Sequence, residues 1–504
     1  LYSDPKAFTS LRKRLSAYFL QSDVVFRSLE EVDLEKILRE IDEDRRRAKL
    51  VLEKRAVQEI RDLFRTTLVV VESPNKARTI AGFFGKPQMR LIGESVAYEV
   101  PLGERLLVLT ASLGHVLDLV TDRGFFGVLE EEDRYVPVYD TLKRCREKNL
   151  QHTDYAYLKE RCGGRIEDKM TLLEGMRLAG YEVDEIFIAT DPDAEGEKIA
   201  YDLFLLLRPF NGSIKRAEFH EVTPRAFRDA VENPRSFDTN LVKAQIVRRV
   251  LDRWVGFTLS RILWKVFGRS WFSAGRVQTP VLGWVIERYK KSKEKKGEIL
   301  FRIKGHPFRM EVEDPELAER IFGDLERASV ALESPREEER KPPPPFSTDT
   351  VLEEADRQLG LSARETMNLL QSLFEAGLIT YHRTDSVRVS TAGIHHVAEP
   401  FITERFGREF FQPRSWGEGG AHECIRPTRP LDPDNLRFMI AADLLKLEGD
   451  PRKALKLYEL VFRRFMASQM KPVRVVVEKL SLKLPYYSWS EEVVTEIREH
   501  GFDL

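Results

Sequence analysis

The sequence is poor in cysteine and has no long apolar run. Only three of its 504 residues are Cys, which excludes a small fold held together by several disulfides. Cys145, Cys162 and Cys424 lack a paired metal-ligand spacing and no signal peptide precedes them, so we expect free thiols in a reducing cytoplasm. The longest purely apolar runs, such as residues 203–207, are far shorter than the ~18 residues that span a bilayer, which excludes a transmembrane helix.

Side-chain amides are also scarce, and neither sign of charge is in excess. The chain has 7 Asn and 10 Gln, whereas Asp, Glu, Lys and Arg make up 32% of it, compared with ~25% in ordinary soluble proteins. Few amides and many ion-pairing residues favour a protein built for high temperature. With 81 basic and 82 acidic residues the net charge is −1. Only local clusters could therefore indicate a nucleic-acid partner.

No G-x-x-x-x-G-K-[ST] motif occurs, so this chain itself carries no P-loop ATPase. At ~150 residues per domain, the length predicts about three domains, each large enough to bury its own core.

Two short apolar, β-branched runs at residues 67–72 and 185–190 predict buried parallel strands, each followed by a helix. Glu72 ends the first strand, and the second runs into the acids Asp191, Asp193 and Glu195. Carboxylates at the carboxyl ends of parallel strands favour a site for a hard cation such as Mg²⁺. Alternatively, these acids cap a helix N-terminus, which accounts for one acid more easily than for four.

Residues 219–289 have a helical pattern, and here the local charge departs from the average. Between residues 242 and 276 there is one acid, Asp252, against eight basic residues: Lys243, Arg248, Arg249, Arg253, Arg261, Lys265, Arg269 and Arg276. Aromatic residues alternate with them: Trp254, Phe257, Trp264, Trp271 and Phe272. This pattern suits a groove that follows phosphates and stacks bases, or else a core helix whose aromatic residues point inward.

The C-terminal half contains two further polar motifs. Four prolines at 342–345 predict a stiff spacer, two helices are expected within 346–379, and Tyr381-His382-Arg383 follows. A Tyr nucleophile needs nearby positive charge, which Arg383 could supply. The second motif offers His422 and Arg426 to a phosphate. A Tyr is more often a core residue than a nucleophile, so neither motif is specific alone.

Taken together and in order, the motifs resemble those of type IA DNA topoisomerases. The similarity extends over about residues 67–470 and rests on VESPNKARTI, ATDPDAEGEKIA, FHEVT, AQIVRRVLDRWVGF, SAGRVQTP, the long segment ending in LITYHRTDS, and HECIRPT. The stretch GHVLDLVTDRGFFGV followed by VPVYDTLKRC is similar to the version in the topoisomerase half of reverse gyrases. That similarity places a helicase-like, ATP-dependent half upstream, which fits a chain that begins with Leu1.

The resemblance implies a multidomain α/β plus α fold, in which a Toprim α/β domain precedes helical and β domains arranged as a toroid around a DNA-sized hole. Six segments are implied, with these expected bounds: a helical connector at 1–65, the Toprim domain at 66–215 with a degenerate zinc-finger insertion near 140–165, a basic helical DNA-binding domain at 216–290, a β-rich gate or hinge region at 291–345, a winged-helix-like domain with the reactive Tyr at 346–434, and the return of the helical domain and gate strands at 435–504.

The resemblance also implies residue roles. Tyr381 would form a 5′-phosphotyrosyl bond, assisted by Arg383, Glu72, Lys76 and His422. The Mg²⁺ ligands would be Glu72, Asp191, Asp193 and Glu195, and the DNA contacts would be Arg248, Arg249, Asp252, Arg276, Gln278 and Arg426. The insertion keeps only Cys145 and Cys162 of a four-cysteine finger, too few ligands for structural zinc, so we expect two free thiols in a surface loop and no zinc.

The expected partners are single-stranded or underwound DNA and the upstream helicase-like half, through which ATP would act. We expect no membrane partner, and we expect the chain to be a cytoplasmic monomer. Joined to that half, the enzyme would introduce positive supercoils. Three alternatives stay open: a stand-alone type IA topoisomerase that relaxes negative supercoils, a Toprim nuclease or primase, and a clamp that binds single strands without cutting them.

Overall fold

The computed structural model describes residues 65–504, except Glu94, Asp133, Arg146, Lys304 and 418–421, together with scattered positions between 39 and 55. The expected helical connector at 1–65 therefore lies almost wholly outside the described residues. The chain divides into two compact units, which are described separately. Unit 1 comprises Leu1–Val250 and Glu375–Gly377, and unit 2 comprises Leu251–Phe374 and Leu378–Leu504.

Unit 1 is built on a six-stranded sheet in the order β13-β12-β1-β4-β3-β2. Its four parallel strands are β1 (Arg65–Val71), β4 (Arg105–Ala111), β12 (Glu185–Ile188) and β13 (Ile214–Arg216). The other two, β2 (Gln88–Ile92) and β3 (Ser95–Leu102), complete the sheet in antiparallel pairing. The two strands expected from β-branched runs are thus confirmed, and they are direct neighbours in the sheet.

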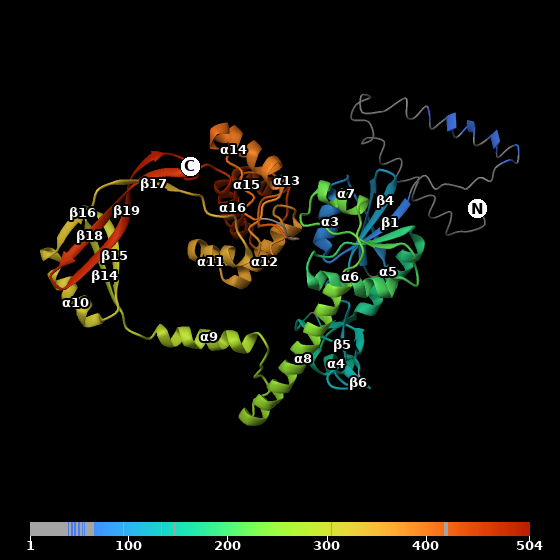
Figure 1. Ribbon diagram of the computed structural model, residues 1–504. Helices are drawn as coiled ribbons and strands as arrows, with labels where there is room; N and C mark the ends of the chain where they lie inside the picture. Colours follow the sequence, from blue (N-terminus) through green and yellow to red (C-terminus); the bar gives the residue numbers. More distant parts are fainter. Residues whose placement is uncertain are drawn as a thin grey trace. The chain divides into compact units, whose positions relative to one another are not determined.

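Helices follow the strands as the sequence predicts. Ser73 caps α3 (Pro74–Gly82) by accepting a hydrogen bond from the backbone N of Lys76, with Pro74 in the first turn. On one face of the sheet, α5 (Lys169–Glu182) and α6 (Ala194–Leu207) run side by side (Figure 1). Their apolar residues share a core with alternate residues of β1 and β12, such as Leu68 and Ile186. A shorter helix, α7 (Pro224–Glu232), follows the sheet.

Between β4 and α5 the chain forms small antiparallel pieces around one short helix. These pieces are β5 (Leu117–Leu119) with β8 (Tyr139–Thr141), β6 (Val128–Glu131) with β7 (Arg134–Pro137), and a three-stranded sheet of β9 (Lys143–Cys145), β10 (Leu150–His152) and β11 (Ile166–Asp168), accompanied by α4 (Tyr155–Cys162).

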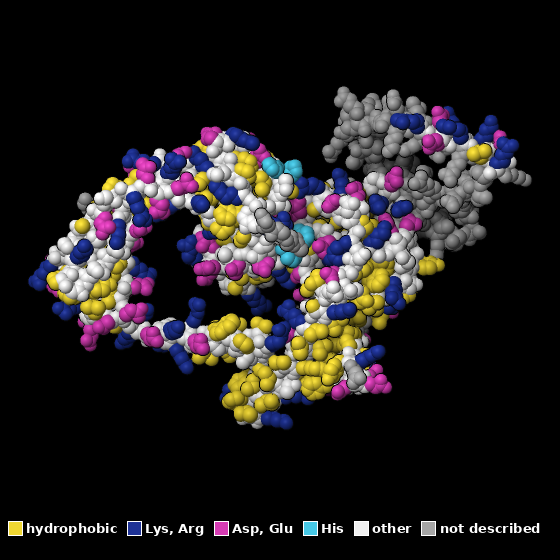
Figure 2. Space-filling view, viewed as in Figure 1, with side chains coloured by type: hydrophobic (Ala, Val, Ile, Leu, Met, Phe, Trp, Pro, Cys, Tyr) yellow, Lys and Arg dark blue, Asp and Glu magenta, His cyan; other side chains and the backbone are white. Residues whose placement is uncertain are grey.

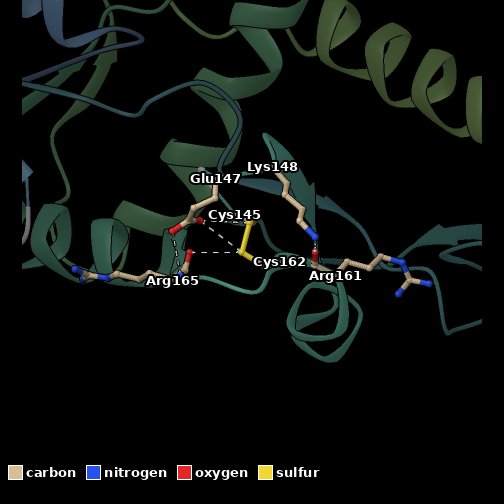
Figure 3. The surroundings of a disulfide bond; sticks show 6 residues. All are labelled: Cys145, Glu147, Lys148, Arg161, Cys162 and Arg165. Atoms are coloured by element: carbon tan, nitrogen blue, oxygen red, sulfur yellow. Dashed lines mark hydrogen bonds between the residues drawn. A yellow bond between two sulfur atoms is a disulfide. The ribbon is translucent and has the colours of Figure 1, made fainter.

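The expectation of two free thiols here is wrong, because Cys145 and Cys162 form a disulfide (Figure 3). Cys145 ends the central strand β9 and Cys162 ends α4, which packs on that strand, so their Cα atoms lie 5.8 Å apart. Sequence spacing alone could not reveal this approach. Both cysteines are buried, and the Glu147 carboxylate lies 3.5 Å from one sulfur and 3.6 Å from the other. With both sulfurs in one bond, the pair cannot act as thiolate ligands for zinc, as expected.

Two long helices follow, α8 (Thr239–Phe267) and α9 (Gln278–Lys291). Every side chain of α9 is at least partly exposed, and Figure 2 shows apolar side chains gathered over both helices. The aromatic residues Phe257, Trp264 and Trp271 are 39%, 41% and 71% exposed. The interpretation of this window as a core helix with inward-pointing aromatic residues therefore does not hold for these three.

The β part of unit 2 combines a hairpin with a four-stranded sheet. The hairpin pairs β14 (Gly297–Ile303) with β15 (His306–Val312) and packs against α10 (Pro315–Asp324). In the sheet, β18 (Val473–Leu484) pairs with β16 (Ser329–Leu332), β17 (Arg336–Arg340) and β19 (Tyr487–Glu499). Apolar residues of the hairpin, of α10 and of β18 form one core.

The helical part of unit 2 contains the two expected helices, α11 (Thr348–Leu359) and α12 (Ala363–Glu375), the last residue of which belongs to unit 1. They are separated at Gly360, whose φ of 64° suits glycine. It also contains α13 (Thr391–Gly393), α14 (Glu399–Arg405), α15 (Pro433–Ala441) and α16 (Pro451–Ser468). None of the helices in the described part of the chain combines the length and the apolar character needed to cross a membrane.

Candidate active site

The sheet of unit 1 brings two of the predicted acids into contact. Because β1 and β12 are parallel neighbours, their carboxyl ends lie at the same edge. Glu72 follows β1, and its carboxylate accepts a hydrogen bond of 2.9 Å from the backbone N of Asp191, which follows β12. Two segments separated by 119 positions in the sequence therefore meet at this edge.

Lys76 joins the same cluster from the first turns of α3. Its side chain is 1% exposed, and the ammonium forms an ion pair with the Asp191 carboxylate. Burial disfavours the charged ammonium, but the Asp191 and Glu72 carboxylates outweigh this effect and raise the pKa of Lys76. Burial, together with the charge of Asp191, raises the pKa of Glu72 to about 7. Burial is thus the main cause of the raised pKa of Glu72; the charge of Asp191 adds to it and that of Lys76 opposes it.

The other two acids have separate partners. The Asp193 carboxylate caps α6 by accepting from the backbone N of Gly196 at 2.7 Å, so helix capping explains this one acid. A Cβ at Gly196 would lie 2.2 Å from the carbonyl oxygen of Asp191, so only glycine allows this tight turn. The Glu195 side chain is exposed, and its Oε1 lies 3.1 Å from Nε2 of His115.

Carboxylates are the ligands of a hard divalent cation, and the four acids fit one chemically. In the described part of the chain, however, Cys145, Glu147 and Cys162 are the only residues that place three potential ligand atoms within 4.8 Å of one another. The acids are thus near one another without forming a ready-made coordination shell. Asp191 instead faces Lys76 and Glu195 faces His115.

A buried arginine that the sequence reasoning missed supports the acidic loop. Arg216 at the end of β13 is fully buried and donates to the carbonyl oxygens of Thr190 and Asp191, each at 2.9 Å. Its Nε donates to Glu197 at 3.1 Å, and Arg235 also bonds Glu197. Such a buried arginine could have been suspected only from its place at a predicted strand end, which is a weak signal.

The reactive Tyr predicted in unit 2 is buried in an aromatic environment. Tyr381 is 3% exposed, and its ring centroid lies 5.2 Å from that of Phe374, 5.6 Å from His382 and 6.4 Å from His422. Two predicted site residues from different motifs, Tyr381 and His422, are therefore brought together. Arg383 is exposed.

Arg426 lies in a different environment from the other predicted DNA contacts. It is 1% exposed, and its guanidinium donates to both carboxylate oxygens of Glu423, at 2.9 and 2.7 Å, and to Ser390. Burial opposes the charge of Glu423, but the Arg426 guanidinium outweighs it and lowers the pKa of this carboxyl. This arrangement supports the local fold, and contact between Arg426 and DNA stays a prediction.

The remaining predicted DNA contacts lie on α8, on α9 or between them. Arg248, Arg276 and Gln278 are exposed. In unit 1, Arg249 forms a paired hydrogen bond with Asp118, at 3.0 and 2.6 Å. In unit 2, Arg276 donates to Asp252 at 2.7 Å. Acidic partners thus orient these two arginines at exposed positions.

Comparisons with known proteins agree with these features. The family model described as DNA topoisomerase matches residues 236–503, and the Toprim domain model matches residues 67–222. Reverse gyrase 2 of Aquifex aeolicus (strain VF5) is 67% identical over 503 residues, covering 100% of this chain and 43% of the relative. The reverse gyrase of Pyrococcus furiosus is 47% identical over 494 residues, covering 96% of this chain and 40% of the relative.

A solved structure, full-length Topoisomerase I from Thermotoga maritima, is similar to this chain with a TM-score of 0.62 and 31% identity. The match covers 86% of this chain and 66% of that one. The chain spans about two fifths of the length of the reverse gyrases it matches.

Proposed function

The chain belongs to the type IA DNA topoisomerases and matches the topoisomerase part of reverse gyrases, and from this we propose that it cuts and rejoins single DNA strands through Tyr381. The Tyr381 Oη gives up its proton and attacks a backbone phosphate, the bond from phosphorus to the 3′ oxygen breaks, and the 3′ oxygen takes up one proton, so the protons balance. The phosphotyrosyl ester conserves the energy of the broken bond, so religation needs no ATP. The buried side chain of Tyr381 beside His422 is the observation that carries this proposal.

In this proposal the residues around the two sites share the work of stabilising charge. Arg383 and His422 lie in the two motifs around Tyr381 and would stabilise the developing phosphorane charge. Lys76, whose raised pKa keeps it protonated, would contact the scissile phosphate, with Glu72 beside it to hold or release a proton.

Glu72, Asp191, Asp193 and Glu195 are the residues that would hold a divalent cation, for which we propose Mg²⁺. The carboxylate donor set and the match to the Toprim domain support this assignment. The cation would screen the phosphate charge. Burial and the charge of Asp191 raise the pKa of Glu72, and a cation at this position would oppose both effects and favour the ionised carboxylate.

Single-stranded or underwound DNA is the proposed substrate, held by Arg248, Arg249, Asp252 and Arg276 of the basic window and by Gln278 and Arg426 outside it. Exposed aromatic residues such as Trp264 and Trp271 supply stacking surfaces next to the arginines. We further propose that the expected domains close into a toroid and that residues 291–345 act in its gate. In a full-length protein, an ATP-dependent helicase-like half would direct strand passage toward positive supercoils.

The test compares the wild-type chain with Tyr381→Phe on negatively supercoiled plasmid and on single-stranded DNA at high temperature with Mg²⁺. The wild-type chain is expected to relax the plasmid and to yield a covalent protein–DNA adduct after denaturation with detergent. Tyr381→Phe, which keeps the ring packing, should lose both activities. Retention of cleavage by Tyr381→Phe would instead support a nuclease, and binding without any cleavage by the wild type would support a clamp.

A further inference from the structure

A third parallel strand delivers a side chain to the edge of the sheet where the acids lie. In the sheet order β12-β1-β4, Asp191 follows β12, Glu72 follows β1 and His115 follows β4. His115 reaches the exposed Glu195 carboxylate at 3.1 Å through Nε2. The sequence reasoning did not single out this histidine, although the apolar run at 105–111 before it is a clear strand signal.

The loop that carries His115 has a specific conformation. Leu113 and Gly114 both adopt positive φ, at 59° and 81°, and such values are costly for a leucine. The surroundings fix this turn on both sides: the backbone N of Ser112 donates to Val71 at 2.8 Å, and Lys169 Nζ donates to the carbonyl oxygens of Ser112 at 3.0 Å and Leu113 at 2.8 Å. Beyond the turn, the backbone N of Leu142 donates to Val116 at 2.9 Å. The histidine is thus presented from a rigid support.

The position of His115 does not fit a core role. Its side chain is 34% exposed and that of Glu195 is 48% exposed, so their removal would leave no buried cavity. An exposed hydrogen bond of this kind contributes little to folding stability. The hydrogen bond does favour those Glu195 rotamers that keep the carboxylate within reach of the imidazole.

We propose that His115 is a positioning residue, which holds the Glu195 carboxylate in place for a divalent cation at the acidic cluster. This inference rests on the proposed function, because it requires a cation among those acids. With its proton on Nε2, the imidazole donates to Glu195 Oε1 and fixes the direction in which the carboxylate faces. Groups that orient metal ligands in this way typically change affinity by 10–100-fold.

The test measures Mn²⁺ binding to the protein alone, without DNA, by electron paramagnetic resonance of the free ion. His115→Ala should weaken Mn²⁺ binding about tenfold, at the low end of that range because the pair is exposed. His115→Gln, whose side-chain N–H can replace the donor, should recover most of the affinity. His306→Ala removes an exposed histidine of β15 and should leave binding unchanged. Lys169→Met, which releases the supporting carbonyl oxygens, should weaken binding in the same direction as His115→Ala.

An Asp191→Asn, Asp193→Asn double variant separates the two ways of failing. If the wild type binds Mn²⁺ no better than this double variant, the proposed metal site is wrong and the role of His115 falls with it. If the double variant loses binding while His115→Ala binds like the wild type, the metal site stands and the positioning role is refuted. The same refutation follows if His115→Ala reduces only DNA binding, which would make His115 a direct DNA contact.

Discussion

Breaking the Cys145–Cys162 disulfide should loosen the small sheet of β9, β10 and β11 without unfolding the rest of unit 1. The bridge closes a segment with a sequence separation of 17 between a strand and the end of a helix. The sheet itself consists of three strands of three residues each, and α4 has eight residues. Elements this short contribute few apolar contacts of their own, so the cross-link is expected to dominate their local stability.

The size of the effect follows from chain entropy. For the separation of 17, the loop-closure relation gives about 3 kcal/mol at 25 °C. A loss of that size raises the population of the locally open state roughly 100-fold. Unit 1 retains its central sheet, whose core residues come from other segments, so global unfolding should change far less.

Hydrogen exchange followed by mass spectrometry measures this local opening. The amides of residues 143–168 should exchange roughly 100-fold faster in a Cys145→Ser, Cys162→Ser variant, while those of β1 and β12 keep their protection. Reductant should reproduce the effect in the wild type and add nothing in the variant. Cys424 gives no competing signal, because burial raises the pKa of its thiol and keeps it unreactive.

Equal exchange in the variant and the wild type would refute the reasoning, because it would mean that packing alone holds these strands. Faster exchange throughout unit 1 would refute it in another way, since the insertion would then be part of the cooperative core. Either result would also weaken the argument that Lys169, which follows β11, gives the His115 loop a rigid support.

Three further predictions concern other buried and exposed charges. The folded-state pKa of Glu72, about 7, lies above its ordinary value of 4.5. The stability that this carboxyl contributes is therefore complete below pH 4.5 and is lost as the pH rises through 7. In urea titrations between pH 5 and pH 8, Glu72→Gln should make the decrease in the free energy of unfolding less steep. Arg216→Met leaves the carbonyl oxygens of Thr190 and Asp191 without their donor, while Glu197 keeps Arg235 as a partner, so urea unfolding should show a loss of about 1–3 kcal/mol. Arg249→Ala breaks an exposed ion pair with Asp118 and should cost at most about 1 kcal/mol of stability. If Arg249 contacts a phosphate, the variant should also bind single-stranded DNA less tightly, and the slope of log affinity against log salt concentration should decrease in magnitude by about 0.7.

Local patterns allowed the parallel strands and their helices to be predicted. The buried runs before Glu72 and Asp191 have only one stable environment, a strand covered on both faces. Ser73 and Pro74 then mark the start of α3. Because strand ends of a parallel sheet share an edge, the meeting of these two acids also followed from the pattern.

Other features depend on contacts that no local pattern encodes. The disulfide requires α4 to pack on β9, and the partners of Lys76 and Arg216 depend on which strands are neighbours. His115 was missed because a single histidine after a strand carries no signal until the sheet order places that strand beside the acids. The aromatic pattern on α8 and after it was compatible with a groove or with a core helix, because an amphipathic pattern does not reveal what covers the helix, and the exposure of these residues favours the groove.

The pairing of β1 with β12 also has a consequence for the order of folding. The backbone N of Thr66 donates a hydrogen bond to the Asp184 carboxylate across a sequence separation of 118. Contacts between residues so far apart in sequence form late in folding, because closing the intervening chain costs conformational entropy. The edge that gathers Glu72 and Asp191 therefore comes into existence only when the central sheet is complete. A cation held there would bind the native sheet and no earlier state, and would stabilise it by mass action. Loading the site would then slow unfolding of the sheet rather than speed its formation.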